Sequence, residues 1–198
     1  MAASHLIRLS AIKGKSGVLE ALKHNKRTLQ AEHGAGVNID VTKTPLNYCL
    51  TDPATPDAIA LHAKVQVVKA GIDMLRKNQI MAVEVVFSLP TDRRSQDTRP
   101  FFNDYLAWVK QSLASEVLSF DVHLDGSAPH AHAVISPLID DKMQGICLIS
   151  VKGNLMRLIN LFYSEIATRY GLAKDCRKRL CAKDKHSIER QVLALKDR

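Results

Sequence analysis

Apolar and polar residues follow two different periods along this chain, and these periods predict its elements. Four stretches rich in Val, Ile, Leu and Phe end at glycine, proline or polar residues and predict strands: residues 5–12, 80–89, 117–125 and 130–138. The turn Gly126–Pro129 separates the last two, so the third strand can fold back beside the fourth. The segment before the second strand is mostly helical, and the glycine-containing residues 32–48 predict a loop with at most one short strand.

Between the strands, apolar residues recur with a period near 3.6, which predicts amphipathic helices. The expected helices cover about residues 18–30, 57–78, 101–114, 154–170 and 184–195. On the first helix, His24 and Arg27 are three residues apart and are expected to share a face. The second helix is expected to have one apolar side, formed by Ile59, Val65, Val68, Ile72 and Leu75.

Strands interleaved with helices, with several strands joined by short turns, predict an α+β fold. We expect a central, mainly antiparallel sheet flanked by helices. A length of 198 residues corresponds to one domain, so residues 1–198 are interpreted as a single unit.

Composition narrows the class of protein. Hydrophobic residues make up 46% and charged residues 24% of the chain, which excludes wholesale disorder. Apolar runs stay well short of the ~18 residues that cross a bilayer, and the N-terminus lacks the layout of a signal peptide. Four cysteines without C-x-x-C spacing argue against a disulfide framework. We therefore expect a cytoplasmic protein with no membrane segment and with reduced thiols.

The net charge of +8 is concentrated at the two ends of the sequence. Residues 1–30 hold six Lys or Arg against one acidic residue, and residues 172–198 hold nine against four. Basic ends around a near-neutral middle suggest that the protein binds a polyanion, with nucleic acid the leading candidate.

The richest chemistry lies in the segment FDVHLDGSAPHAHAVISPL, residues 120–138. In a strand, His130 and His132 point to one face about 7 Å apart, and the preceding turn brings His123 opposite them. Three converging imidazoles suit a divalent transition ion with positions left open for water or substrate. The competing interpretation is that these histidines are scattered residues, because H-x-H pairs also arise by chance.

These residues resemble a known family. HLDGSAPHAH (123–132) is similar to the HxDExxPHxH motif of the Mob/Pre plasmid-mobilisation relaxases, which belong to the HUH endonuclease superfamily. LKHNKR (22–27) resembles the family's HNxR segment, and NIDVTKTPLNYCLT (38–51) resembles its asparagine-containing loop that ends in LNY. KDKHSIER (183–190) is similar to the lysine-histidine stretch that closes the catalytic domain. The resemblance implies a single HUH relaxase-like catalytic domain, without the family's usual C-terminal helical region.

The resemblance also implies an activity and roles for individual residues. His24 would attack one DNA strand at a transfer origin and leave a covalent 5′-phosphohistidine adduct, with Arg27 beside it on the scissile phosphate. His123, His130 and His132 would hold Mn²⁺, with Mg²⁺ or another transition ion as alternatives. The expected DNA contacts are Arg8, Asn25, Asn47, Tyr48, Arg177, Lys178 and Arg179.

The same resemblance implies partners. The DNA partner would be the single strand and hairpin of a transfer origin. A full-length protein would also meet the coupling protein of a type IV secretion system.

One position departs from the family motif, because Gly126 stands where the motif has glutamate. Asp125 and Glu84 are the candidate replacements for that carboxylate, as activators of the nucleophile. Two alternative functions stay open: a non-catalytic DNA-binding relative, and an HUH replication initiator or transposase that uses Tyr163 or Tyr170.

Overall fold

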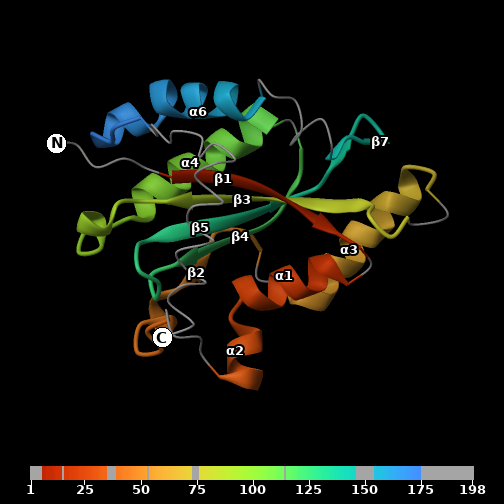
Figure 1. Cartoon of the computed structure of the whole chain (residues 1–198), viewed down its shortest axis with the longest axis horizontal. Coiled ribbons are helices and arrows are strands. Elements are labelled where there is room, and N and C mark those ends of the chain that lie inside the picture. Colours follow the sequence, from red (N-terminus) through yellow and green to blue (C-terminus); the bar gives the residue numbers. More distant parts are fainter. Residues whose placement is uncertain are drawn as a thin grey trace, which may run out of the picture.

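The computed structural model describes residues 6–14, 16–34, 39–52, 54–72, 76–113, 115–145 and 154–174. Figure 1 shows how its elements are arranged. The strands are β1 (Leu6–Lys13), β2 (Tyr48–Cys49), β3 (Ile80–Ser88), β4 (Val117–His123), β5 (His130–Ile135), β6 (Leu138–Ile139) and β7 (Lys142–Met143). The α-helices are α1 (Gly17–Asn25), α2 (Thr28–His33), α3 (Pro56–Lys69), α4 (Arg99–Leu113) and α6 (Asn154–Glu165). Three single turns of 3₁₀ helix are η1 (Thr44–Leu46), η2 (Thr91–Arg93) and η3 (Ala167–Tyr170).

A five-stranded sheet with the order β1-β3-β5-β4-β2 forms the centre of the fold. All four of its pairings are antiparallel. The expected α+β fold with a mainly antiparallel central sheet is therefore confirmed. The hairpin predicted across Gly126–Pro129 is present as β4 and β5, with His123 paired directly to His130.

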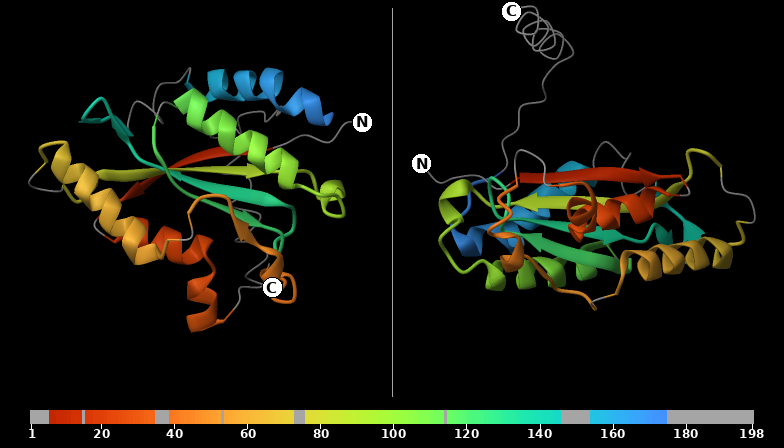
Figure 2. Two further views of the ribbon diagram at one scale, coloured as in Figure 1. Left: turned by 180° about the vertical axis from the view of Figure 1, so that it is seen from behind. Right: turned by 90° about the horizontal axis from the view of Figure 1, so that it is seen from below.

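Each face of the sheet has a different cover (Figures 1 and 2). On one face, alternate strand residues such as Phe87 and Phe120 pack with α4 and α6 in a large aromatic core. On the other face, Ala82 and Val134 pack with α1 and α3. This second core covers only one end of the sheet. The other end of the same face carries polar residues, because His130 and His132 share the side of β5 to which Val134 belongs.

The first expected helix is interrupted, and this corrects the prediction of a continuous helix over 18–30. The chain leaves α1 after Asn25, and Arg27 adopts a left-handed conformation with φ of +60° before α2 begins. A non-glycine residue in this conformation needs compensating contacts. His24 and Arg27 therefore do not share a helix face, although they are three residues apart.

Helix α3 differs from its prediction in both length and orientation. It ends at Lys69 instead of Asn78, and Gly71 follows with a φ of +70°. Of the expected apolar side, Ile59 is buried as predicted, but Val65 and Val68 are exposed by 42% and 65%, and Ala63 and Val67 are buried in their place. Ile59, Ala60, Ala63 and Val67 pack together against the sheet and α1, so the buried side of the helix is turned away from Val65 and Val68.

The ends of the other strands and helices differ less from their predicted positions. The strand expected to reach Asp125 ends at His123, and the one expected to reach Leu138 ends at Ile135. The helix expected over 154–170 becomes α6 followed by the 3₁₀ turn η3. The helix expected over 184–195 lies outside the described residues. Among the helices described, none combines the length and the hydropathy that a membrane crossing requires.

Candidate functional site

Three histidines meet at the open end of the sheet. Because His123 on β4 pairs with His130 on β5, and His132 follows two residues later, all three project from the α1 side. Their ring centroids lie 4.8–5.2 Å apart. One nitrogen from each ring falls within 4.8 Å of the other two, which makes this the one possible metal-binding group of three in the part of the chain described. The predicted convergence is confirmed.

Each ring also has a partner behind it that fixes which nitrogen carries the proton. His123 Nε2 donates to the main-chain oxygen of Asn25 at 2.6 Å, and His130 Nδ1 donates to that of Ala128 at 2.8 Å. His132 Nδ1 donates to Glu84 Oε1 at 2.9 Å. Since these oxygens can only accept, a neutral ring carries its proton on the nitrogen that faces them and leaves the opposite nitrogen free as a ligand, which is the arrangement found behind metal-ligating histidines.

The distance between two histidine nitrogens indicates that the cluster fits a cation. His123 Nδ1 and His130 Nε2 face each other at 3.2 Å, and the partners behind the rings leave both nitrogens without a proton. Two lone pairs at this distance repel each other unless a cation lies between them. Two nitrogens bound to one ion at about 2.1 Å are about 3–3.4 Å apart. An all-imidazole donor set favours a transition ion over Mg²⁺, which prefers oxygen.

Burial keeps the rings of His123 and His130 neutral. It is the main cause that lowers the pKa of His123 to about 2 and that of His130 to about 4, from an ordinary 6.5. Both rings therefore stay able to accept a metal well below pH 6.5. Below about pH 6.5 the unfolded chain takes up protons at these two histidines while the folded rings do not. The free energy of unfolding therefore falls as the pH drops below that value.

His24 lies beside this cluster, in the last turn of α1. Its ring centroid is 6.2 Å from that of His132, in an edge-on arrangement. The side chain is partly exposed to solvent. Partial burial and the positive charge of Arg27 lower the pKa of His24 below its ordinary 6.5. At neutral pH the imidazole is therefore uncharged and carries a free lone pair.

Arg27 is held from within the protein. Its Nε and Nη2 donate to the two carboxylate oxygens of Asp125 at 3.1 and 2.7 Å, and the pair is buried. Asp125 also accepts from Asn47 Nδ2 at 2.7 Å. Burial would raise the pKa of Asp125, but these hydrogen bonds lower it below its ordinary value. Asp125 thus anchors the break between α1 and α2, and none of its described hydrogen bonds goes to His24.

Glu84 points into the site rather than toward solvent. It accepts from His132 Nδ1 at 2.9 Å, from Asn25 Nδ2 at 3.1 Å and from Ser10 Oγ at 3.3 Å. Burial alone would raise the pKa of Glu84, but these hydrogen bonds, that from His132 above all, lower it to about 2. Glu84 is therefore an ionised carboxylate behind a candidate metal ligand.

Gly126 cannot simply be exchanged for the glutamate of the motif. A Cβ at this position would lie 2.7 Å from His130 Cε1, so a side chain here requires His130 to move. The main-chain oxygen of Gly126 accepts from Arg94 Nη2 at 2.5 Å. This contact could not be predicted from the residue pattern, because Arg94 lies in a polar turn 32 residues earlier.

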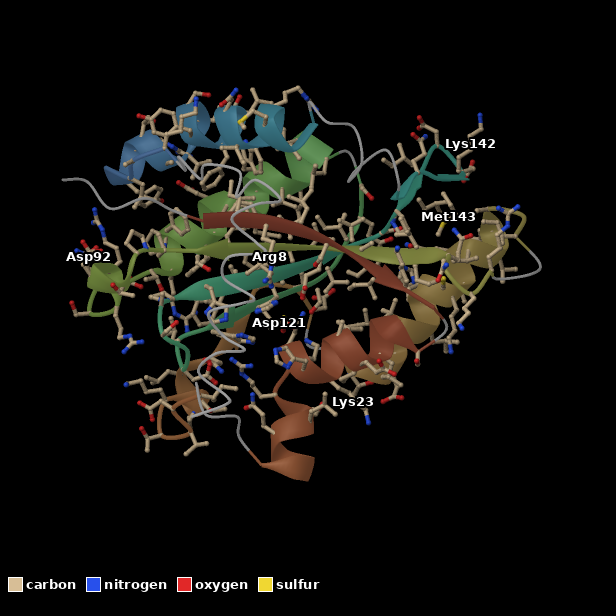
Figure 3. All side chains as sticks on the ribbon, in the orientation of Figure 1. Arg8, Lys23, Asp92, Asp121, Lys142 and Met143 are labelled. Carbon is tan, nitrogen blue, oxygen red and sulfur yellow. The ribbon has the colours of Figure 1, made fainter. Side chains whose placement is uncertain are left out.

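The residues expected to contact DNA differ in their exposure to solvent and in their contacts. Arg8 is exposed on β1, on the α1 side of the sheet (Figure 3), and forms no hydrogen bond or ion pair with the described residues. Asn25 is only 2% exposed, so its side chain serves the interior instead of a DNA surface. Asn47 Oδ1 accepts from the Leu124 N–H at 2.7 Å, and the Tyr48 ring is covered by Arg99 at 4.1 Å. The other three expected contacts, Arg177, Lys178 and Arg179, lie outside the described residues.

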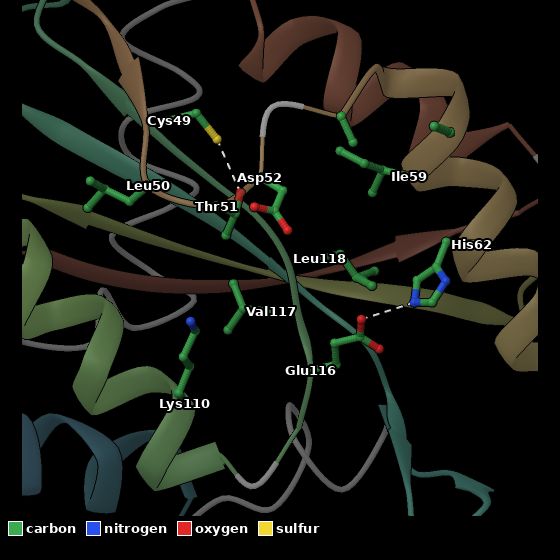
Figure 4. A pocket seen from close by; sticks show the side chains of 12 residues that line it. Cys49, Leu50, Thr51, Asp52, Ile59, His62, Lys110, Glu116, Val117 and Leu118 are labelled. Carbon is green, nitrogen blue, oxygen red and sulfur yellow. Dashed lines mark hydrogen bonds and ion pairs between the residues drawn. The ribbon is translucent and has the colours of Figure 1, made fainter.

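Two cavities lie near this region. One of about 260 Å³ borders His123 and is lined by the α1–α2 junction and the LNY segment. Within it, Lys26 Nζ forms an ion pair with Asp121 Oδ1 at 3.1 Å, which the sequence did not signal. The other, of about 680 Å³, lies along β4 between α3 and α4, where His62 contacts Glu116 (Figure 4). None of the three clustered histidines lines this larger cavity.

Comparisons with known proteins place this chain in a family. The sequence model of the Mob_Pre family, described as plasmid recombination enzyme, matches residues 1–174. A plasmid recombination enzyme type 3 of Staphylococcus aureus is 24% identical over 177 residues, which cover 85% of this chain and 42% of that protein. The chain thus spans less than half the length of this curated relative.

Solved structures share the fold. A Mn-bound crystal structure of the MobM relaxase domain (MOBV; Mob_Pre) with plasmid pMV158 oriT DNA, at pH 5.5, matches with a TM-score of 0.74 and 21% identity. The match covers 90% of this chain and 92% of that one. A Mn-bound structure of the same domain at pH 4.6 gives 0.70 and 19% identity, over 93% of this chain and 100% of that one. The expected relaxase-like fold is confirmed.

Proposed function

This chain belongs to the Mob_Pre family of plasmid recombination enzymes, and we propose that it nicks one DNA strand at a plasmid or mobile-element transfer origin. One observation carries the proposal: a neutral, accessible imidazole, His24, lies beside three imidazoles whose free nitrogens converge. A nucleophile next to a cation site suits phosphoryl transfer, in which charge builds up on the phosphate oxygens. Support comes from the related MobM domain, which is bound to oriT DNA and to Mn.

In the proposed reaction, His24 acts as the nucleophile. Its unprotonated nitrogen attacks phosphorus, a P–N bond forms, and the bond from phosphorus to the 3′ oxygen breaks. The 3′ oxygen leaves with the bonding electron pair and takes up a proton, while the imidazole loses its ring proton to solvent. The products are a free 3′-hydroxyl and a 5′-phosphate on His24. The P–N linkage stores the energy for later rejoining of the strand.

The metal, when bound, would be held by His123, His130 and His132 and would supply Lewis-acid polarisation of a phosphate oxygen. We propose manganese as the ion. The all-imidazole donor set and the low pKa values of His123 and His130 support this choice. The Mn-bound structures of the related MobM domain at pH 5.5 and 4.6 are consistent with a site that accepts metal in acid.

The tyrosine-using alternative has less support. Tyr163 and Tyr170 pack against the core under α4 and α6, on the face of the sheet opposite His24. The Tyr170 hydroxyl donates to Asp104 at 2.8 Å, and burial together with this carboxylate raises the pKa of Tyr170 to about 12. Such a phenol is a poor nucleophile near neutral pH. The partnership with a type IV secretion coupling protein stays a prediction.

Incubation with supercoiled plasmid tests the proposed function. With Mn²⁺ and a plasmid that carries the cognate transfer origin, we expect conversion of supercoiled to open-circular DNA on an agarose gel. A plasmid with a scrambled origin should stay supercoiled. Binding to the origin without any nicking would instead support the non-catalytic alternative, in which the loss of the motif glutamate at Gly126 abolishes turnover.

We further propose that Arg8 holds a phosphate of the bound strand. Arg8 pairs with Val86 and Val86 pairs with His132, so Arg8 lies two strands from the metal cluster on the same face. Adjacent strands are about 4.8 Å apart, which gives roughly 10 Å between the two Cα atoms. Arginine suits bidentate contact with phosphate.

Arg8→Gln should weaken binding of an origin single strand by about 1 kcal/mol, roughly fivefold in Kd. It should also reduce the slope of log Kd against log salt by about 0.7, the value for one lost phosphate contact. Fluorescence anisotropy over a range of salt concentrations measures both. The matched control is Arg157→Gln, an exposed arginine on α6 at the opposite face. Equal slopes for the two variants would mean that Arg8 is only a solvated charge.

A further inference from the structure

Asn25 contacts two separate parts of the metal cluster. Its main-chain oxygen accepts from His123 Nε2 at 2.6 Å. Its side-chain Nδ2 donates to Glu84 Oε1 at 3.1 Å, and the same oxygen accepts from His132 Nδ1 at 2.9 Å. The orientation of two of the three candidate ligands therefore depends on one residue, which directly follows His24 in the chain.

The break after α1 makes the first of these contacts available. In a continuous helix the oxygen of Asn25 would accept from the N–H of Leu29. Because α1 ends at Asn25 and Arg27 turns into the left-handed region, this oxygen is one of the unpaired acceptors at a helix C-terminus. His123 satisfies it. The ion pair between Arg27 and Asp125 holds the break, and Asp125 lies only two residues beyond His123.

The side chain of Asn25 is poorly suited to a purely structural role. It is buried, and its Oδ1 has no hydrogen-bond partner among the residues that the structure describes. An unsatisfied buried acceptor costs stability that a leucine of similar size would avoid. What the amide offers, and leucine does not, is the N–H that donates to Glu84.

We propose that Asn25 is a positioning residue that couples metal binding to the placement of His24. This inference rests on the proposed function, in which His24 is the nucleophile. If the end of α1 must be in place for His123 and His132 to be oriented, binding of the ion must stabilise the end of α1 by the same factor. Metal occupancy then orders the nucleophile before DNA arrives.

Manganese affinity tests the first half of this coupling. Asn25→Leu should weaken Mn²⁺ binding 10- to 100-fold, the range typical for loss of a group behind a metal ligand. If the side chain acts through Glu84, the same change made in a Glu84→Gln background should alter the affinity by less than about twofold. Isothermal titration calorimetry of the four proteins gives this cycle. Gln66→Leu is the matched control, since Gln66 is also a buried amide that donates to a carboxylate, Glu116, but lies on α3.

Hydrogen exchange tests the second half. In the wild-type protein and in Gln66→Leu, Mn²⁺ should slow amide exchange in residues 19–27. In Asn25→Leu, at a Mn²⁺ concentration that saturates the variant, this protection should be at least halved. If Asn25→Leu does not fold, Glu84→Gln, which preserves side-chain volume, takes its place in the same measurement. Wild-type Mn²⁺ affinity, or undiminished protection at the end of α1, would overturn the coupling.

The outcomes separate this inference from the proposed function. Weak Mn²⁺ binding by Asn25→Leu, together with persistent nicking by His24→Ala, would retain the positioning role and refute the nucleophile. Inactive His24→Ala together with unchanged Mn²⁺ binding by Asn25→Leu would support the nucleophile and refute the positioning role.

Discussion

His24→Ala should lower the rate of origin nicking by at least ~10³-fold while leaving the fold and Mn²⁺ binding intact. The reason is chemical: no other described side chain offers a neutral imidazole at this position beside the metal cluster. The ring of His24 is partly exposed and none of its hydrogen bonds supports the three clustered histidines, so its removal should cost little stability. Conversion of supercoiled plasmid, followed over time on gels, measures the rate.

The matched control for this variant is His62→Ala. His62 is an exposed histidine on α3, in contact with Glu116 and remote from the cluster. This variant should nick at the wild-type rate. If His24→Ala nicks as fast as His62→Ala, the proposed nucleophile is wrong.

The second large effect concerns the metal. The double change His130→Ala/His132→Ala should weaken Mn²⁺ binding more than ~100-fold, beyond the loss expected when only a group behind a ligand is removed. It leaves one of three imidazoles, so the cation site no longer exists. Isothermal titration calorimetry measures the affinity directly, again with His62→Ala as control.

Thermal unfolding provides an independent measurement of the same effect. A ligand at 100 times its Kd stabilises a folded protein by about 2.7 kcal/mol. Mn²⁺ should therefore raise the Tm of the wild-type protein and of His62→Ala but not that of the double variant. An unchanged affinity in the double variant would mean that the ion binds elsewhere.

The hairpin and its histidines could be predicted because local rules govern them. The turn at Gly126–Pro129 and the alternation of side chains in a strand are enough to bring His123, His130 and His132 together. The antiparallel sheet could be predicted for the same reason, because short turns join several of its expected strands. These features depend on residues close in sequence, where periodicity is a strong signal.

The α1–α2 junction could not be predicted in this way. Arg27 enters the left-handed region without a glycine or proline to mark the position, and the contact that compensates for it comes from Asp125, 98 residues away. The inward orientation of Glu84 depends on His132, 48 residues later. Such buried polar partnerships are decided by tertiary structure, and they explain why sequence reasoning left Asp125 and Glu84 as alternatives.

The choice of the buried side of α3 could not be predicted from the sequence either. Periodicity alone favoured the larger valines as the buried side. The structure instead buries Ala60, Ala63 and Val67 beside Ile59, against the sheet and α1, and leaves Val65 and Val68 exposed. Predicting that choice requires knowledge of the neighbours.

The central claim, that a histidine carries the DNA, is tested most directly by the chemistry of the covalent adduct. A phosphorus–nitrogen bond to imidazole is labile in acid and stable in base, whereas a tyrosyl phosphodiester survives mild acid. Wild-type protein should form an adduct with a labelled origin single strand that mild acid destroys and alkali preserves. His24→Ala should form none, and Tyr48→Phe, Tyr163→Phe and Tyr170→Phe should retain it. An acid-stable adduct that persists in His24→Ala would contradict this account and assign the reaction to a tyrosine.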